Sequence, residues 1–109
     1  MEIGGYTRNI LKVNLTSGAV EKEALSMELL KKFIGPEGVS FRWAYDLIRP
    51  KMDPLSENSP IILGSGPIVG SPVPASSRVF ALFKHLNYGG VIENSHAGGD
   101  LGPMLKWAG

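Results

Sequence analysis

Residues 64–78 read GSGPIVGSPVPASSR and lie between two short apolar runs, residues 61–63 and 79–83. Both runs are rich in β-branched or aromatic residues and are bounded by Gly and Pro, which predicts two strands. The connecting segment contains three glycines and three prolines. Glycine allows positive φ and close approach of a ligand to the backbone, whereas proline stiffens the chain. So long a loop in a small domain indicates either a functional loop or, as the plainer alternative, an ordinary surface connection.

A second glycine-rich segment, SHAGGDLG at residues 95–102, follows a predicted short strand at 91–93 and precedes a predicted helix at 102–107. The first segment ends in Arg78, whose planar guanidinium offers five donors to a phosphate or a flat polar heterocycle. Backbone N–H groups around Gly98 and Gly99 are suited to an anion. We therefore expect the two segments to converge on one ligand, with a solvated Arg78 as the alternative.

The remaining pattern predicts a small α+β fold. Alternating residues at 6–13 and 19–24, joined by a turn at Gly18, are typical of a β-hairpin. Two helices are expected at 27–34 and 39–48, with the Gly-Pro-Glu-Gly sequence at 35–38 ending the first. The second helix carries an apolar face, in which we include Tyr45. The fold class expected is a small, mostly antiparallel sheet with two or three helices, in a single domain at residues 1–109.

Composition limits the possible partners. The chain has 109 residues, 43% of them hydrophobic and 19% charged, so it should bury a core. Its formal net charge of +1 gives no reason to expect a nucleic-acid or membrane-surface partner. No apolar run approaches the roughly 18 residues that span a bilayer, and no signal peptide is evident at the N-terminus. Because the chain has no Cys, it cannot form disulfides or hold a cysteine-ligated iron–sulfur cluster.

Common catalytic patterns are missing from the sequence. Glu93 and His96 have the spacing of a metal-binding pair on a helix, but on a strand residues three apart point to opposite faces. No Gly-x-Ser-x-Gly elbow surrounds any serine, and no phosphate loop ending in Gly-Lys-Ser/Thr is present. The residues by themselves thus support anion binding and name no reaction.

Four motifs in order resemble the N-terminal domain of the aldehyde ferredoxin oxidoreductase family, the tungsten or molybdenum bis-pterin enzymes. They are RNILKVNLTSG at 8–18, DPLSEN at 53–58, GPIVGSPVP at 66–74 leading to Arg78, and GGDLGPMLKWAG at 98–109. The similarity extends over nearly the whole chain. It implies half of an αββα sandwich, with one sheet face or edge left without a partner.

The resemblance also implies a site. Arg78 matches an arginine that lies between the pterin and an iron–sulfur cluster, and the backbone carbonyl of His96 matches a ligand to a magnesium ion that bridges the pterin phosphates. The residues expected to form the floor of the cofactor site are Ser77, Arg78, Ser95, His96, Ala97, Gly98 and Gly99.

Members of this family are several times longer, so the 109 residues alone are not expected to be active. The cluster cysteines would come from the remainder of the oxidoreductase or from a cysteine-bearing subunit, and the location would be cytoplasmic. The implied reaction is oxidation of an aldehyde to an acid, with electrons passed to ferredoxin. Aryl-CoA reductases share the domain, which leaves the substrate class open. The alternative is a non-catalytic stand-alone or remnant module that forms a homodimer.

Overall fold

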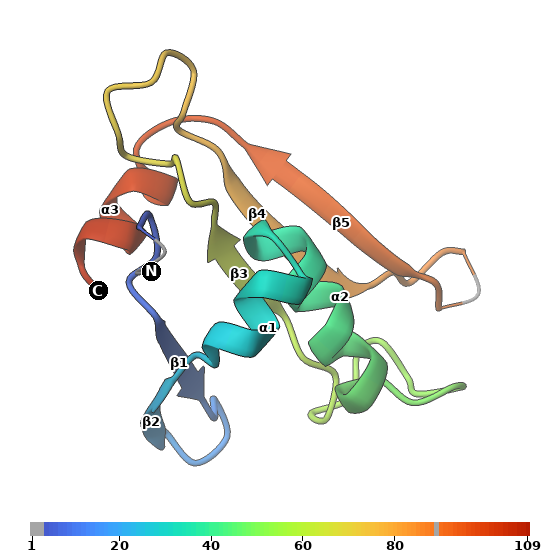
Figure 1. The fold of residues 1–109 in the computed structure, drawn as a ribbon. Coiled ribbons are helices and arrows are strands. Elements are labelled where there is room, and N and C mark those ends of the chain that lie inside the picture. The colour runs from blue at the N-terminus through green and yellow to red at the C-terminus, as the bar shows by residue number, and fades with distance from the viewer. Residues whose placement is uncertain (1–3, 89) are drawn as a thin grey trace.

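The computed structural model describes residues 4–88 and 90–109 and contains both predicted types of element (Figure 1). The α+β class predicted from the sequence is confirmed, although the strands form two sheets rather than one. Along the chain the elements are β1 Asn9–Val13, β2 Val20–Ala24, α1 Met27–Lys32, α2 Gly35–Leu47, β3 Ile62–Ser65, β4 Val79–Lys84, β5 Ile92–Ala97 and α3 Leu101–Trp107.

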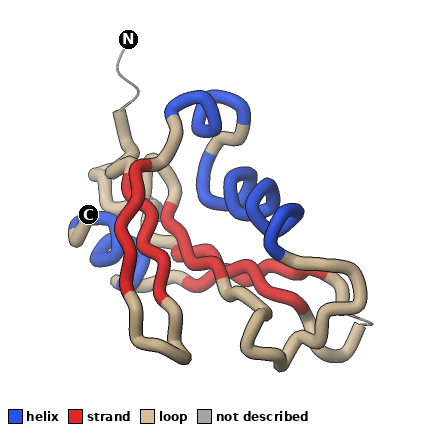
Figure 2. Tube along the Cα trace, turned by 90° about the horizontal axis from the view of Figure 1, so that it is seen from below, coloured by secondary structure: helices blue, strands red, loops and turns tan. Residues whose placement is uncertain are grey.

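The hydrophobic core lies between α2 and the antiparallel sheet β3-β4-β5. Phe80 and Leu82 of β4 point to the same face because side chains alternate along a strand. They pack against Ala44 and Ile48, and none of these four side chains is more than 7% exposed. Figure 2 shows α1 and α2 together on this side of the three strands. Burial of these apolar groups fixes α2 across the sheet.

The β1–β2 hairpin forms as predicted, but as a separate two-stranded sheet. Its turn contains Gly18, whose φ of 71° is in the left-handed region that glycine adopts without steric cost. The Asn14 side chain accepts hydrogen bonds from the backbone N–H groups of Thr16 and Ser17, each at 3.0 Å. The turn is therefore specified by local chemistry.

Two predictions about the second helix were wrong. Residues 35–38 do not end a helix: they form the first turn of α2, where Pro36 is tolerated because N–H groups there have no partner within the helix. Tyr45 is 83% exposed rather than part of the core. Successive helical residues are about 100° apart, so the neighbour of the central buried residue Ala44 points away from the sheet.

The sheet face opposite α2 is only partly exposed: Val79 on this face is 6% exposed, and α3 contacts both β3 and β4. Leu63 of β3 is 57% exposed, and Ala81, opposite it on β4, lies on the same face. Among the described residues, more large apolar side chains are exposed than buried. These side chains are distributed over the hairpin, α2, the loops and α3 as well as β3, and Leu63 is the exposed large apolar residue that the described strands place on this face. No helix in the described part of the chain is both long and apolar enough to cross a membrane.

Candidate functional site

The two glycine-rich segments meet at one end of the three-stranded sheet. The register of β4 and β5 pairs Val79 with Ala97, so Arg78 and Gly98 are opposite each other one step beyond the ladder. The second segment is partly a strand, because β5 runs on to Ala97 rather than ending at residue 93. The predicted convergence of the two segments therefore results from strand pairing.

Helix α3 packs against the end of the first segment through Gly102. This glycine is buried, and a β-carbon built there would lie 3.0 Å from the carbonyl oxygens of both Ser77 and Arg78. Such a distance is too short for an ordinary carbon–oxygen contact. Glycine at this position thus allows the helix to approach the backbone that carries Arg78.

The backbone of His96 faces away from the sheet. Residues of an antiparallel pair alternate between exchanging both hydrogen bonds and exchanging none. The His85 N–H donates to the Val91 carbonyl at 2.8 Å, so the regular register makes Phe80 and His96 a pair without mutual hydrogen bonds. Because β5 is the outer strand of this sheet, the His96 carbonyl points to its open edge. A carbonyl in this position is available to a metal ion.

The two adjacent glycines differ in what they require. Gly99 has a φ of 103°, a conformation that other residues rarely adopt. Gly98 has no positive φ, and a β-carbon built on it would meet nothing within 4 Å. The described part of the fold thus does not need glycine at position 98, and the space beside its backbone is open to a ligand.

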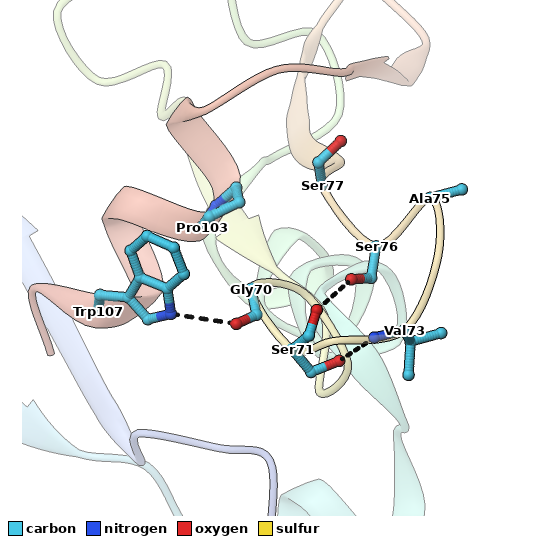
Figure 3. Close-up of a pocket in the computed structure, with 8 residues that line it drawn as sticks. All are labelled: Gly70, Ser71, Val73, Ala75, Ser76, Ser77, Pro103 and Trp107. Carbon is cyan, nitrogen blue, oxygen red and sulfur yellow. Dashed lines mark hydrogen bonds between the residues drawn. The ribbon is translucent and has the colours of Figure 1, made fainter.

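Arg78 and Ser77 precede β4 without being part of it. The Arg78 side chain is exposed and has no hydrogen-bond or ion-pair partner among residues 4–88 and 90–109. Ser77 is half-buried, and its hydroxyl points away from Trp107 in Figure 3. An exposed, unpaired guanidinium beside an open glycine backbone fits an anionic or polar planar group.

Ser95 and Ala97 differ from His96 in two respects. Their backbone groups lie in hydrogen-bonded pairs with Ala81 and Val79, so they are used within the sheet. Their side chains are on the face opposite that of His96, whose ring packs edge-on against Phe80 with centroids 5.3 Å apart. The predicted site residues therefore lie at one end of the β4–β5 pair, while the side chains of Ser95 and Ala97 point to the face opposite that of His96.

The predicted separation of Glu93 and His96 agrees with the structure. The Oε2 atom of Glu93 lies 3.5 Å from the Nε2 atom of His85, whereas the ring of His96 packs on the other face of the sheet against Phe80. Within the described residues, no group of three His, Cys, Asp or Glu side chains is arranged to hold a metal ion.

Two further residues of α3 hold the 66–78 loop and were not predicted. The Lys106 Nζ atom donates to the carbonyls of Gly66, at 3.2 Å, and Pro67, while the Trp107 indole donates to the Gly70 carbonyl at 3.2 Å (Figure 3). Desolvation lowers the pKa of Lys106 below its ordinary value of 10.5. Gly102 and Lys106 are four residues apart on a predicted helix and therefore lie on the same face of it. This spacing could have indicated that both residues face the loop.

An open cavity of about 310 Å³ lies between this loop and α3. Its lining is mainly small or apolar and contains no charged side chain (Figure 3): Gly70, Ser71, Val73, Ala75, Ser76, Ser77, Pro103 and Trp107. Two of its serines already bond to backbone atoms of the same loop, with Ser71 Oγ donating to Ile68 and Ser76 Oγ donating to Ser71. The hydroxyls thus stabilise the loop.

Comparison with known proteins points to one family. The family model described as aldehyde ferredoxin oxidoreductase, N-terminal domain, matches residues 10–109. Tungsten-containing aldehyde ferredoxin oxidoreductases of Pyrococcus abyssi and Thermococcus kodakarensis are each 34% identical to the chain over 105 residues. These alignments cover 96% of this chain and 17% of each relative. The chain therefore spans only a small part of the length of the curated relatives it matches.

A solved structure has the same fold. It is described as the active site complex BamBC of benzoyl coenzyme A reductase in complex with 1,5-dienoyl-CoA. The TM-score is 0.91 at 24% sequence identity, and the match covers 97% of this chain and 16% of that chain. From the match of the family model over residues 10–109, together with these relatives, we conclude that the chain belongs to the aldehyde ferredoxin oxidoreductase family and corresponds to its N-terminal domain.

Proposed function

We propose that residues 1–109 form part of the floor of a tungsten- or molybdenum-pterin site in a larger oxidoreductase. The observation that carries this proposal is the juxtaposition of Arg78, exposed and without a side-chain partner among the described residues, with Gly98 at one end of the β4–β5 pair. The relatives are tungsten-containing enzymes by name, and the chain matches only 17% of their length. The remaining residues of the site would come from the rest of such an enzyme or from a cysteine-bearing subunit.

Each residue would contribute a different interaction. The Arg78 guanidinium would donate hydrogen bonds to the pterin and place a positive charge beside it. The open backbone at Gly98 and Gly99 would allow the planar group to approach closely, since no side chain intervenes. The outward carbonyl of His96 would bind a magnesium ion at the pterin phosphates, a role suited to a hard oxygen ligand. Ser77, Ser95 and Ala97 would border this surface.

When bound, the metal–pterin group would supply two-electron oxidation of an aldehyde to an acid. An iron–sulfur cluster held by cysteines outside this chain would carry the electrons away, and ferredoxin would accept them in the cytoplasm. The contribution of the 109 residues is to bind and orient the cofactor. We expect no oxidation by the chain alone, because it contains no Cys to ligate the cluster.

The first experiment is metal and pterin analysis of the chain purified from its native host, with the mass of every associated polypeptide recorded in the same sample. We expect tungsten or molybdenum and pterin in a fraction that also contains a cysteine-bearing polypeptide. A clean 11.7 kDa product without metal or pterin would contradict the proposal.

Two substitutions localise the site. Arg78→Met and Gly98→Ala should each lower the pterin and metal content per chain without lowering the free energy of unfolding. The matched controls are Arg49→Met, another exposed arginine, and Gly4→Ala, where a β-carbon also meets nothing within 4 Å. Cofactor retention that is equal in all four variants would place the site elsewhere.

A second candidate function is self-association without catalysis. It is favoured by the sheet face that carries Leu63, which is 57% exposed, and by Ile61, which precedes β3 and is 71% exposed. Two copies packed through this face would bury it without any other protein. Light scattering at micromolar concentration should then give twice the mass of 11.7 kDa, and Leu63→Glu should give a monomer. A monomeric wild-type chain would exclude this candidate.

A further inference from the structure

Helix α3 contacts the 66–78 loop at its beginning, middle and end. Lys106 reaches the carbonyls of Gly66 and Pro67 where the chain leaves β3. Trp107 reaches the carbonyl of Gly70. Gly102 lies against the backbone of residues 77 and 78, just before β4. A single short helix thus contacts both ends of a loop that is closed by strand pairing.

The carbonyls at the start of the loop accept hydrogen bonds from inside and outside it. The Gly66 carbonyl accepts from the Val69 N–H at 3.2 Å and from Lys106 Nζ at 3.2 Å. Within the loop, the Gly70 N–H donates to the Ser76 carbonyl at 2.9 Å, and the Ser71 N–H donates to the Ile68 carbonyl at 3.2 Å. These bonds form turns within the loop. The loop is attached to the rest of the molecule by the Val69 side chain, which is only 6% exposed, and by the bonds from Lys106 and Trp107.

The ammonium of Lys106 is a strong donor for this purpose. A hydrogen bond from a charged donor is shorter and roughly twice as strong as a neutral one. Lys106 is half-buried and donates to two adjacent carbonyls, so it orients the peptide that precedes Ile68. Trp107 then fixes Gly70, whose φ of 73° no other residue would readily adopt.

We propose that Lys106 and Trp107 are positioning residues, which hold the 66–78 loop on α3 and so restrict the Arg78 side chain at the end of that loop. This inference rests on the proposed function, because Arg78 is the residue through which they act on the cofactor. Both side chains are engaged with carbonyls of the loop. Loss of either hydrogen bond loosens the loop on α3 and widens the range of positions open to the Arg78 side chain, while strand pairing keeps the backbones of residues 78 and 98 opposite each other.

The loop can be followed in the 109-residue chain itself by hydrogen exchange. The amides of Val69, Gly70 and Ser71 bond within the loop and report its opening. Lys106→Met should speed their exchange about tenfold or more, because loss of a charge-assisted hydrogen bond raises the equilibrium constant for loop opening by about that factor. Lys106→Arg should restore slow exchange, since a guanidinium can donate to both carbonyls. The matched control Lys22→Met alters an exposed lysine of β2 and should have no effect.

A second variant tests the hydrogen bond of the Trp107 indole independently of Lys106. Trp107→Phe keeps an aromatic ring but removes the Nε1 donor to Gly70. It should speed exchange at Gly70 more than at the amides of β4. If Lys106→Met and Trp107→Phe both leave exchange at Val69, Gly70 and Ser71 unchanged, the inference is wrong.

The link to the cofactor is tested by metal and pterin content after purification from the native host. Lys106→Met should lower the content several-fold, and Lys106→Arg should restore it. Wild-type chain without any cofactor would refute the proposed function, while the exchange data would still decide whether Lys106 and Trp107 hold the loop. Faster exchange with unchanged cofactor content in Lys106→Met would overturn the positioning role.

Discussion

Gly102 of α3 lies directly against Arg78, so that a β-carbon at position 102 would be 3.0 Å from the carbonyl carbon and oxygen of Arg78. This contact joins the helix that follows the second glycine-rich segment to the last residue of the first. It is made by two backbones, which cannot move apart as easily as two side chains. The position of Arg78 is thus tied to that of α3.

Gly102→Ala should destabilise the chain, because the added methyl group meets backbone atoms of Ser77 and Arg78 rather than flexible side chains. Overpacking of this kind costs about 1–3 kcal/mol. Urea denaturation should show the loss as a lower midpoint. The control Gly98→Ala should be neutral or stabilising by about 0.4–1 kcal/mol, since it restricts the unfolded chain without a clash. Equal stability of the two variants would contradict the contact.

Leu82→Ala should cost about 2–5 kcal/mol, because Leu82 is 0% exposed in the core between β4 and α2. Leu63→Ala, on the opposite face of the same sheet, should change the free energy of unfolding by no more than about 0.5 kcal/mol. Chemical denaturation of both variants provides the comparison. A large, concentration-dependent loss in Leu63→Ala would instead indicate that this face is buried by self-association.

Lys106 should make stability depend on pH in the alkaline range. Desolvation lowers the pKa of Lys106 in the folded chain below the ordinary 10.5. Between that lowered pKa and 10.5, the unfolded chain therefore binds more protons than the folded chain. The free energy of unfolding therefore rises with pH in that window. At each pH, the free energy of unfolding of Lys106→Met is subtracted from that of the wild type, which isolates the contribution of Lys106. A difference that falls as pH approaches 10.5 would contradict the sign.

Lys51→Gly should stabilise the chain. Lys51 has a φ of 62° in the turn after α2 and an exposed side chain. Relief of the left-handed conformation gains about 1–2 kcal/mol, and the added freedom of the unfolded chain offsets about 0.4–1 kcal/mol. A rise in thermal midpoint would confirm the net gain. Lys31→Gly in α1 should have the opposite effect, because glycine costs about 1 kcal/mol within a helix.

Local patterns were sufficient for most of the elements. The hairpin turn at Gly18, the apolar runs that became β3 and β4, and the first helix each depend on residues close together in the chain. Two boundaries were missed for different reasons. Pro36 is compatible with either a helix end or a helix start, and residues 94–97 become a strand only because β4 offers them a partner.

The candidate site was predictable in composition but not in arrangement. Its glycines and Arg78 stand out in the sequence, and their meeting was expected. The outward direction of the His96 carbonyl follows from the register of β5, and a shift of one residue would turn it into the sheet. The hydrogen bonds of Lys106 join residues 39 and 40 positions apart.

The sequence by itself determined the α+β class, the turns and the residue types available for a ligand, because these follow from steric preferences and hydrophobic periodicity over a few residues. Only the tertiary structure decided that Gly102 touches Arg78, that Lys106 holds Gly66 and Pro67, and that Gly98 has open space beside it. Such contacts arise when α3 and the sheet pack together, and packing depends on surfaces that distant parts of the chain form jointly.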